Sequence, residues 1–230
     1  MRASTQVDFL SPTIPIHTIR ATAPGPTAWI EAGIHGDEIA GVHALEELLE
    51  AGLEPERGTL IVCPIMNPGA YRARHRTAPD GLDLNRCFPG DPGGARLEHR
   101  LAATFMDTMI DARPDLLVTL HESKNKFHPD VQPSFGQTVV YGVQPAPSIV
   151  AAAVSKMNTS VRNPAEVWAP HHYPVSTSST EVIVERLGCV GLCIETWMGF
   201  PLSRRVAMHR EIVCVLLDEV GVGARFQANT

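Results

Sequence analysis

The chain has 230 residues, of which 44% are hydrophobic and 19% are charged, and its formal net charge at pH 7 is −6. This composition is typical of a globular protein, and the length suits one large α/β domain or two small ones. The acidic balance disfavours a nucleic-acid partner, and no apolar run approaches the ~18 residues that would span a membrane.

The five cysteines are an odd number, which favours reduced thiols over a set of disulfides. Cys63, Cys189, Cys193 and Cys214 all lie in apolar segments, where a buried free thiol is common. Residues 1–10 lack a basic region followed by an apolar core, so no secretory signal is expected there. We therefore expect a cytoplasmic protein that has no membrane partner.

Strand-like and helix-like segments alternate along the chain. The expected strands are residues 14–19, 28–34, 59–65, 116–120, 138–141 and 190–194. The expected helices are residues 38–51, 95–112, 147–157, 179–187 and 203–220. Several strands are continuous apolar runs, as in central strands that are buried on both faces. This order predicts an α/β fold with a mixed, mostly parallel central sheet and helices on both faces.

Long irregular stretches at residues 67–94, 122–137 and 163–178 follow or flank the expected strands. Loops of this length in a compact domain are usually functional or disordered. In open α/β sheets, ligands bind at the carboxyl ends of the strands. We find no internal repeat and no interdomain linker, so we expect a single domain over residues 1–230.

Polar residues at two strand ends form a candidate metal site. His35 and Glu38 follow the apolar run 28–34, and His121 follows the run 116–120. Two histidines and a glutamate are a common protein ligand set of catalytic zinc, and they leave a fourth position open. The alternative for Glu38 is an acidic residue that opens a helix, and for His121 a polar residue at the sheet rim.

A further carboxylate, Glu195, follows the apolar run 190–194 and is the candidate general base. Zinc lowers the pKa of water and polarises a carbonyl, and a free carboxylate is then needed to carry the proton to the leaving amine. A rim carboxylate that pairs with an arginine is the alternative interpretation of Glu195. Together these residues predict a hydrolase that uses one zinc ion per chain.

The loop between residues 67 and 94 is rich in arginine. Asn85 and Arg86 offer an amide and a guanidinium fork, which suit a substrate carboxylate. Arg76 lies ten residues earlier and is placed to stabilise an oxyanion. For the neighbouring Arg72 and Arg74, a solvated loop is the favoured interpretation. The expected partner is therefore a small amide substrate that carries a carboxylate.

These motifs resemble those of the succinylglutamate desuccinylase/aspartoacylase family, within the zinc carboxypeptidase fold group. The resemblance covers about residues 28 to 200, and its most specific part runs from Arg76 to Gly90. The motifs that carry it are His35-Gly36-Asp37-Glu38, Asn67-Pro68, Arg76, Pro79-Asp80-Gly81-Leu82-Asp83-Leu84-Asn85-Arg86, Phe88-Pro89-Gly90-Asp91, Leu120-His121-Glu122 and Ile194-Glu195-Thr196.

The resemblance implies a zinc carboxypeptidase-like domain with roles for particular residues. The metal ligands would be His35, Glu38 and His121, and Glu195 would activate water. The substrate carboxylate would be held by Asn85 and Arg86, and Arg76 would polarise the scissile carbonyl, with Arg74 as the alternative. Related carboxypeptidases also carry a tyrosine on a loop before the base, and Tyr173 suits that position.

The β-rich C-terminal region of many family members is not expected in this chain, so their particular substrates are not carried over. The leading prediction is zinc-dependent cleavage of an amide next to a free carboxylate, as in the deacylation of an N-acyl amino acid. The alternative is a metallocarboxypeptidase or cell-wall peptide amidase that acts on a peptide C-terminus. A binding protein without catalysis and an esterase are further alternatives. The oligomeric state is left open.

Overall fold

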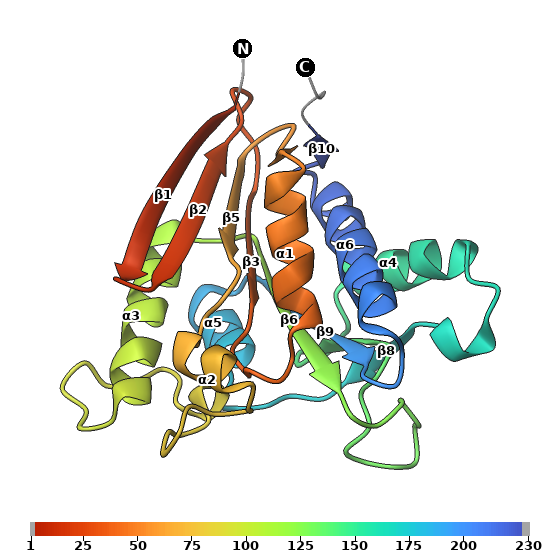
Figure 1. Ribbon diagram of the computed structural model, residues 1–230. Coiled ribbons are helices and arrows are strands. Elements are labelled where there is room, and N and C mark those ends of the chain that lie inside the picture. Colours follow the sequence, from red (N-terminus) through yellow and green to blue (C-terminus); the bar gives the residue numbers. More distant parts are fainter. Residues whose placement is uncertain (1–2, 227–230) are drawn as a thin grey trace.

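Eight strands form the central sheet of the computed structural model, which describes residues 3–226. Their order across the sheet is β1-β2-β5-β3-β6-β9-β7-β8 (Figure 1). Parallel pairing joins β5, β3, β6 and β9 in the middle, and also β7 with β8, whereas the other three pairs are antiparallel. The strands are β1 Ser4–Ser11, β2 Ile14–Arg20, β3 Thr27–Ala32, β5 Thr59–Cys63, β6 Leu116–Ser123, β7 Thr138–Tyr141, β8 Ala169–His172 and β9 Val190–Trp197.

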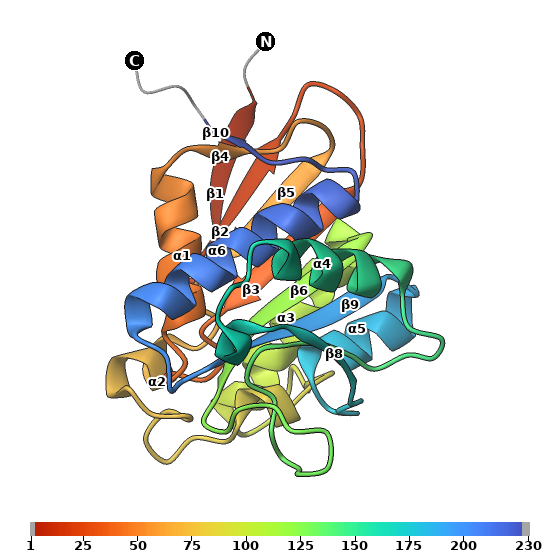
Figure 2. The same ribbon diagram turned by 90° about the vertical axis from the view of Figure 1, so that its right-hand side faces the viewer.

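Helices cover both faces of this sheet (Figure 2). One face is covered by α1 (Ala40–Glu50), α4 (Ser148–Thr159) and α6 (Leu202–Glu219), and the other by α3 (Leu97–Ala112) and α5 (Ser179–Leu187). The remaining short elements are α2 Pro68–Ala73, the 3-10 helices η1 Leu84–Arg86 and η2 Pro164–Glu166, and a small β4–β10 pair formed by Leu53–Glu54 and Arg225–Phe226. The predicted mixed, mostly parallel sheet with helices on both faces is confirmed.

Alternate residues of the central strands supply two separate hydrophobic cores. Trp29 and Leu117 pack with the helices α3 and α5, whereas Ile30 and Val118 pack with α1, α4 and α6. All four side chains are fully buried. A strand buried on both faces has no exposed side to mark with polar residues. This explains why the central strands are continuous apolar runs in the sequence.

The predicted first and last residues are correct for β7 and α5, but they are not correct for the strands that carry site residues. The strands β6 and β9 are longer than predicted, so His121 and Glu195 lie within them rather than after them. The prediction that Glu38 opens the first helix is wrong, because α1 begins at Ala40 after a turn in which the Glu38 N–H donates to the His35 carbonyl. That turn leaves both side chains free to face the sheet edge.

The strands β1 and β8 were not predicted, because neither has a buried apolar run to reveal it. Most residues of β1 are exposed, and this strand is held by its antiparallel pairing with β2. The thiols of all five cysteines are free. Within residues 3–226, no helix has the length and apolarity needed to cross a membrane.

The turn that carries His35 requires a glycine at position 36. A Cβ atom on Gly36 would lie 1.9 Å from the backbone oxygen of Ala70 in α2. We expect Gly36→Ala to lower the free energy of unfolding by roughly 1–3 kcal/mol, because backbone must shift to make room. Gly93→Ala is the matched control, since the nearest atom to its new methyl group would be 3.6 Å away. Denaturant unfolding measures both changes, and equal stability of the two variants would contradict this account.

Candidate metal centre

The register between β6 and β9 places His121 directly beside Glu195. The two residues are paired across these parallel strands, so their side chains leave the same face of the sheet. The strand β3 pairs with the opposite edge of β6 and brings the turn with His35 and Glu38 to the same end. Residues that are far apart in the sequence therefore meet at the carboxyl ends of β3, β6 and β9, and these strand ends lie at the lower end of the sheet in Figure 1.

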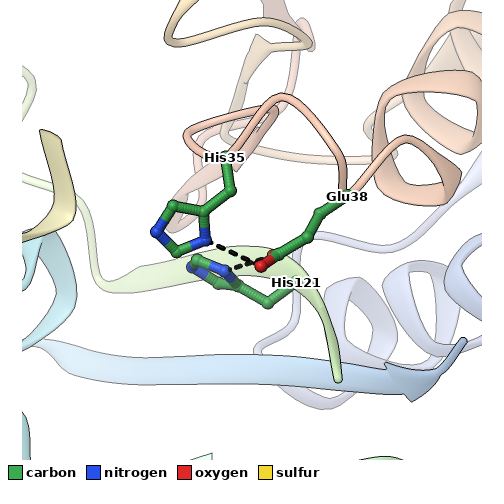
Figure 3. A group of neighbouring side chains, drawn as sticks. All are labelled: His35, Glu38 and His121. Atoms are coloured by element: carbon green, nitrogen blue, oxygen red, sulfur yellow. Dashed lines mark hydrogen bonds and ion pairs between the residues drawn. The ribbon is translucent and has the colours of Figure 1, made fainter. Parts of the chain in front are cut away.

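The Glu38 carboxylate lies between the two histidine rings (Figure 3). Its Oε1 is 2.8 Å from the Nδ1 of His35, and its Oε2 is 2.8 Å from the Nδ1 of His121. One ligand atom from each residue lies within 4.8 Å of the others, and all three residues are buried. In a tetrahedral zinc site, such ligand atoms are each about 2.0–2.2 Å from the metal. The donor types and their convergence therefore fit zinc, provided that the ligand atoms move slightly apart to admit the ion.

Charged neighbours hold the His35 ring in place. Its Nε2 is 3.1 Å from Asp83 Oδ1, so the ring lies between two carboxylates. Burial lowers the pKa of His35, but the charges of Glu38 and Asp83 outweigh it and raise the pKa to about 9. A histidine whose second nitrogen bonds a carboxylate is the usual arrangement around protein-bound metals. The surroundings of His35 thus favour a positive charge, whether a proton or a metal ion.

A buried network supports the site from the side of α1 and α6. Glu122 Oε2 accepts a hydrogen bond of 2.8 Å from the backbone N–H of Ala40, and its Oε1 pairs with Arg205. The backbone N–H of Glu122 donates to Glu38 Oε2 over 3.1 Å. Glu122 therefore ties the start of α1 to β6 and also helps to orient the carboxylate of Glu38.

Glu195 lines the same cavity and makes no ion pair within residues 3–226. Its Oε2 is buried and has no hydrogen-bond partner within residues 3–226, and its Oε1 accepts only a long contact of 3.9 Å from the thiol of Cys193. Burial and the charge of Glu38 raise the pKa of Glu195 well above its usual value. An unsatisfied carboxylate oxygen beside His121 fits a site that holds a ligand.

A cavity of about 430 Å³ opens over these residues, a size that suits a small ligand. Arg74 does not line it, because its guanidinium lies over the ring of Tyr71, 4.7 Å from the centroid. Arg76 does line it, and its Nη1 lies 3.6 Å from Glu38 Oε1 while its Nη2 bonds Asp83. The structure thus brings all the predicted site residues to one cavity: His35, Glu38, Arg76, Asn85, Arg86, His121, Tyr173 and Glu195.

The contacts of Asn85 determine which way its amide faces. Its Oδ1 accepts the backbone N–H of Ser179 over 3.2 Å, so its NH₂ group is the part available to a ligand. The hydroxyl of Ser179 in turn donates to the buried Glu31, 2.8 Å away. Burial raises the pKa of Glu31 to about 7, against the effect of its hydrogen bonds from Ser179 and Trp29.

Sequence reasoning assigned no role to Asp83 or Glu31. Signals for both residues are present in the sequence. Glu31 is a charged residue inside an apolar strand, and Asp83 lies two residues before Asn85. A charge within a central strand indicates a buried partner, since an isolated buried charge is costly. Two of the partners, Ser179 for Glu31 and His35 for Asp83, come from distant segments and could not be identified from spacing.

Comparison with known proteins agrees with this geometry. Residues 24–132 match the model of the succinylglutamate desuccinylase/aspartoacylase catalytic domain. Over these residues the chain is similar to the succinylglutamate desuccinylase/aspartoacylase family. The matched region contains the three candidate metal ligands and also Arg76, Asn85 and Arg86, whereas Tyr173 and Glu195 lie outside it. The family resemblance seen in the sequence motifs is confirmed.

Particular relatives extend the comparison. An N-alpha-acetyl-L-2,4-diaminobutyric acid deacetylase from Halomonas elongata is 39% identical over 110 residues, which are 47% of this chain and 31% of the relative. A solved succinylglutamate desuccinylase from a Silicibacter species is 26% identical, with a TM-score of 0.70 over 94% of this chain and 63% of that one. The curated relative is thus matched over about a third of its length.

A second solved structure shows the fold alone. The cell shape determinant protein of Helicobacter pylori superposes with a TM-score of 0.83 at 17% identity, covering 94% of this chain and 57% of that chain. Another structure of that protein is described as a D,L-carboxypeptidase bound to mDAP. The predicted zinc carboxypeptidase-like fold is therefore confirmed.

The ligand geometry yields a test of metal binding. Purified protein should hold about one zinc per chain, and His121→Ala should weaken zinc binding by more than the roughly 10- to 100-fold that loss of an outer partner costs. His75→Ala is the control, because His75 lies nearby but is exposed. Metal analysis after dialysis against a graded chelator gives the comparison. Equal zinc retention by the two variants would exclude His121 as a ligand.

Proposed function

We propose that this chain is a zinc-dependent hydrolase that cleaves an amide bond next to a free carboxylate. The convergence of His35, Glu38 and His121 beside the unpaired oxygen of Glu195 supports this proposal most directly. Zinc in such a site supplies Lewis acidity, which polarises a carbonyl and brings the pKa of water near neutrality. We propose that the described residues act as one catalytic domain.

The chain's own residues account for the movement of protons. The Glu195 carboxylate takes a proton from the attacking water as the oxygen–carbon bond forms. It then gives this proton to the amide nitrogen as the carbon–nitrogen bond breaks. The Arg76 guanidinium faces the site and stabilises the negative charge that develops on the carbonyl oxygen. Asp83 holds Arg76 in this position with a hydrogen bond of 2.8 Å.

Other residues that line the cavity orient the substrate. The amide of Asn85 presents its NH₂ group, and Arg86 adds a guanidinium next to it, so both donate to a carboxylate of the substrate. Tyr173 lines the cavity mouth, where its ring packs edge-on against Phe135 at 4.8 Å. We infer that Tyr173 covers the bound substrate and limits access of water.

The substrate class that we propose is an N-acyl amino acid. The Halomonas relative with 39% identity is named for the removal of an acetyl group from an amino acid, whereas the carboxypeptidase neighbour resembles this chain at only 17% identity. A cavity of about 430 Å³ suits a ligand of this size. The assignment is therefore to deacylation rather than to trimming of a peptide.

Replacement of Glu195 separates catalysis from metal binding. We expect Glu195→Gln to keep zinc but to lower kcat by roughly 10²- to 10⁴-fold, because the proton acceptor is lost. The zinc-loaded variants are assayed for turnover of a panel of N-acetyl and N-succinyl amino acids, and their zinc content is measured. Glu50→Gln, at an exposed position in α1, is the control. Turnover by Glu195→Gln equal to that of the control would rule out this role.

Replacement of Arg86 tests the recognition of the substrate carboxylate. Arg86→Ala should raise KM by roughly 10- to 100-fold and change kcat less, since a charged hydrogen bond contributes about 1.5–3 kcal/mol. Arg72→Ala removes an exposed arginine of the same region and serves as the control. An N-acyl amino acid amide lacks the carboxylate and should have a higher KM than the acid with the wild-type protein. In Arg86→Ala this difference in KM between the amide and the acid should disappear. If Arg86→Ala left KM unchanged, another residue would have to bind the carboxylate.

A further inference from the structure

Most charged groups that line the cavity are already paired or have a role in the reaction. Glu38 contacts both candidate histidine ligands, and Glu122 pairs with Arg205. Lys124 lies 3.9 Å from Asp37, and Arg76 is paired with Asp83. The charges that remain without a partner in the protein should therefore indicate the charges of the ligand.

Arg86 is the cation without a carboxylate partner. Its guanidinium donates to the backbone oxygen of Asn85 over 2.9 Å and makes no ion pair within residues 3–226. Arg86 and Asn85, whose NH₂ group is free, both line the cavity. One carboxylate of the ligand is accounted for by these two groups, as the proposed function requires.

Glu181 is the anion without a partner. Its carboxylate lines the cavity and makes neither a hydrogen bond nor an ion pair in the described part of the chain. It lies in the first turn of α5, where a negative charge is favourable, but it does not cap the helix. The backbone N–H of Ser178, which a capping glutamate would accept, donates instead to Val175.

The surroundings of Glu181 keep its carboxylate in the cavity wall. A Cβ atom on Gly142 would lie 1.9 Å from Glu181 Oε1, so only glycine at this position lets the carboxylate rest against the backbone after β7. The ring of His172 is held by a contact of 3.1 Å between its Nε2 and the Gly142 carbonyl. Burial raises the pKa of Glu181, although the charge of His172 lowers it. A cationic ligand would offset the cost of keeping this carboxylate charged in a partly buried place.

We propose that the cavity selects an N-acyl amino acid whose side chain ends in a cation, with Glu181 binding that cation while Asn85 and Arg86 hold the α-carboxylate. This inference rests on the proposed function, because it takes the same cavity as the active site. It assigns a specificity-determining residue and narrows the substrate to acylated diamino acids. An acidic or neutral side chain would leave the charge of Glu181 without a partner, which is unfavourable for a partly buried group.

The test compares substrates that differ by one charge. Nα-acetyl-ornithine and Nα-acetyl-norleucine have side chains of the same length, but only the first is cationic. The zinc-loaded wild-type protein should have a kcat/KM roughly 10- to 100-fold higher for the ornithine derivative. Glu181→Gln should remove this preference and leave kcat/KM for the norleucine derivative within about threefold of the wild type.

Control variants separate a binding role from a structural one. Glu185→Gln removes an exposed charge one turn later in α5 and should leave the preference intact. Glu181→Lys should reverse the preference in favour of Nα-acetyl-glutamate. The reversal requires a charge contact with the substrate, because a helix that was merely weakened would reduce the turnover of all substrates equally.

Calorimetric binding of free ornithine and of norleucine to the wild type and to Glu181→Gln gives a readout that needs no turnover. Ornithine should bind more tightly than norleucine only when Glu181 is present. Turnover without any preference for the cationic substrate, or an equal preference in Glu181→Gln, would overturn this inference while the hydrolase assignment stood. If no acylated amino acid were turned over, the proposed function would fail, and equal binding of the two amino acids would then reject the role of Glu181 as well.

Discussion

The interaction on which the site depends is the contact of one carboxylate with two imidazole rings. The Glu38 carboxylate accepts one hydrogen bond of 2.8 Å from His35 and another of 2.8 Å from His121. The two histidines come from segments that are far apart in the chain. The three groups are buried, and Asp83 adds another negative charge behind His35. Such an arrangement has an excess of negative charge that a divalent cation balances, which is why the metal proposal follows from the electrostatics as well as from the ligand types.

Much of the fold and the site could be predicted from the sequence, for identifiable reasons. Buried central strands are continuous apolar runs, so β3, β5, β6 and β9 were found with small errors at their ends. His121 and Glu195 were recognised because a polar residue is conspicuous next to such a run. The exposed strand β1 gives no such pattern, and the contacts of Glu122 and Glu31 depend on partners more than 70 residues away. Spacing along the chain carries no information about partners at that range.

The cavity combines two kinds of recognition that act at different places. The metal candidates and Glu195 lie at the ends of β6 and β9, on rigid elements in the middle of the sheet. Arg86 and Glu181 belong to η1 and to the start of α5, and Ser179 connects these two elements through Asn85. Residues on the sheet are suited to fixed chemistry, whereas residues at helix ends and loops vary more easily among related proteins. In the proposed function, the choice of substrate can therefore change without disturbing the reaction.

The turn that carries His35 is fastened to the arginine loop rather than to the helix that follows it. The Gly36 N–H donates to the carbonyl of His75, one residue before Arg76, and Asp83 bonds both Arg76 and His35. Residues 75–83 and the turn that carries His35 and Glu38 are therefore held together by hydrogen bonds. An insertion or loop exchange anywhere in that stretch would displace the proposed metal ligand His35 together with Arg76, so grafting experiments on this scaffold need to transfer both segments at once.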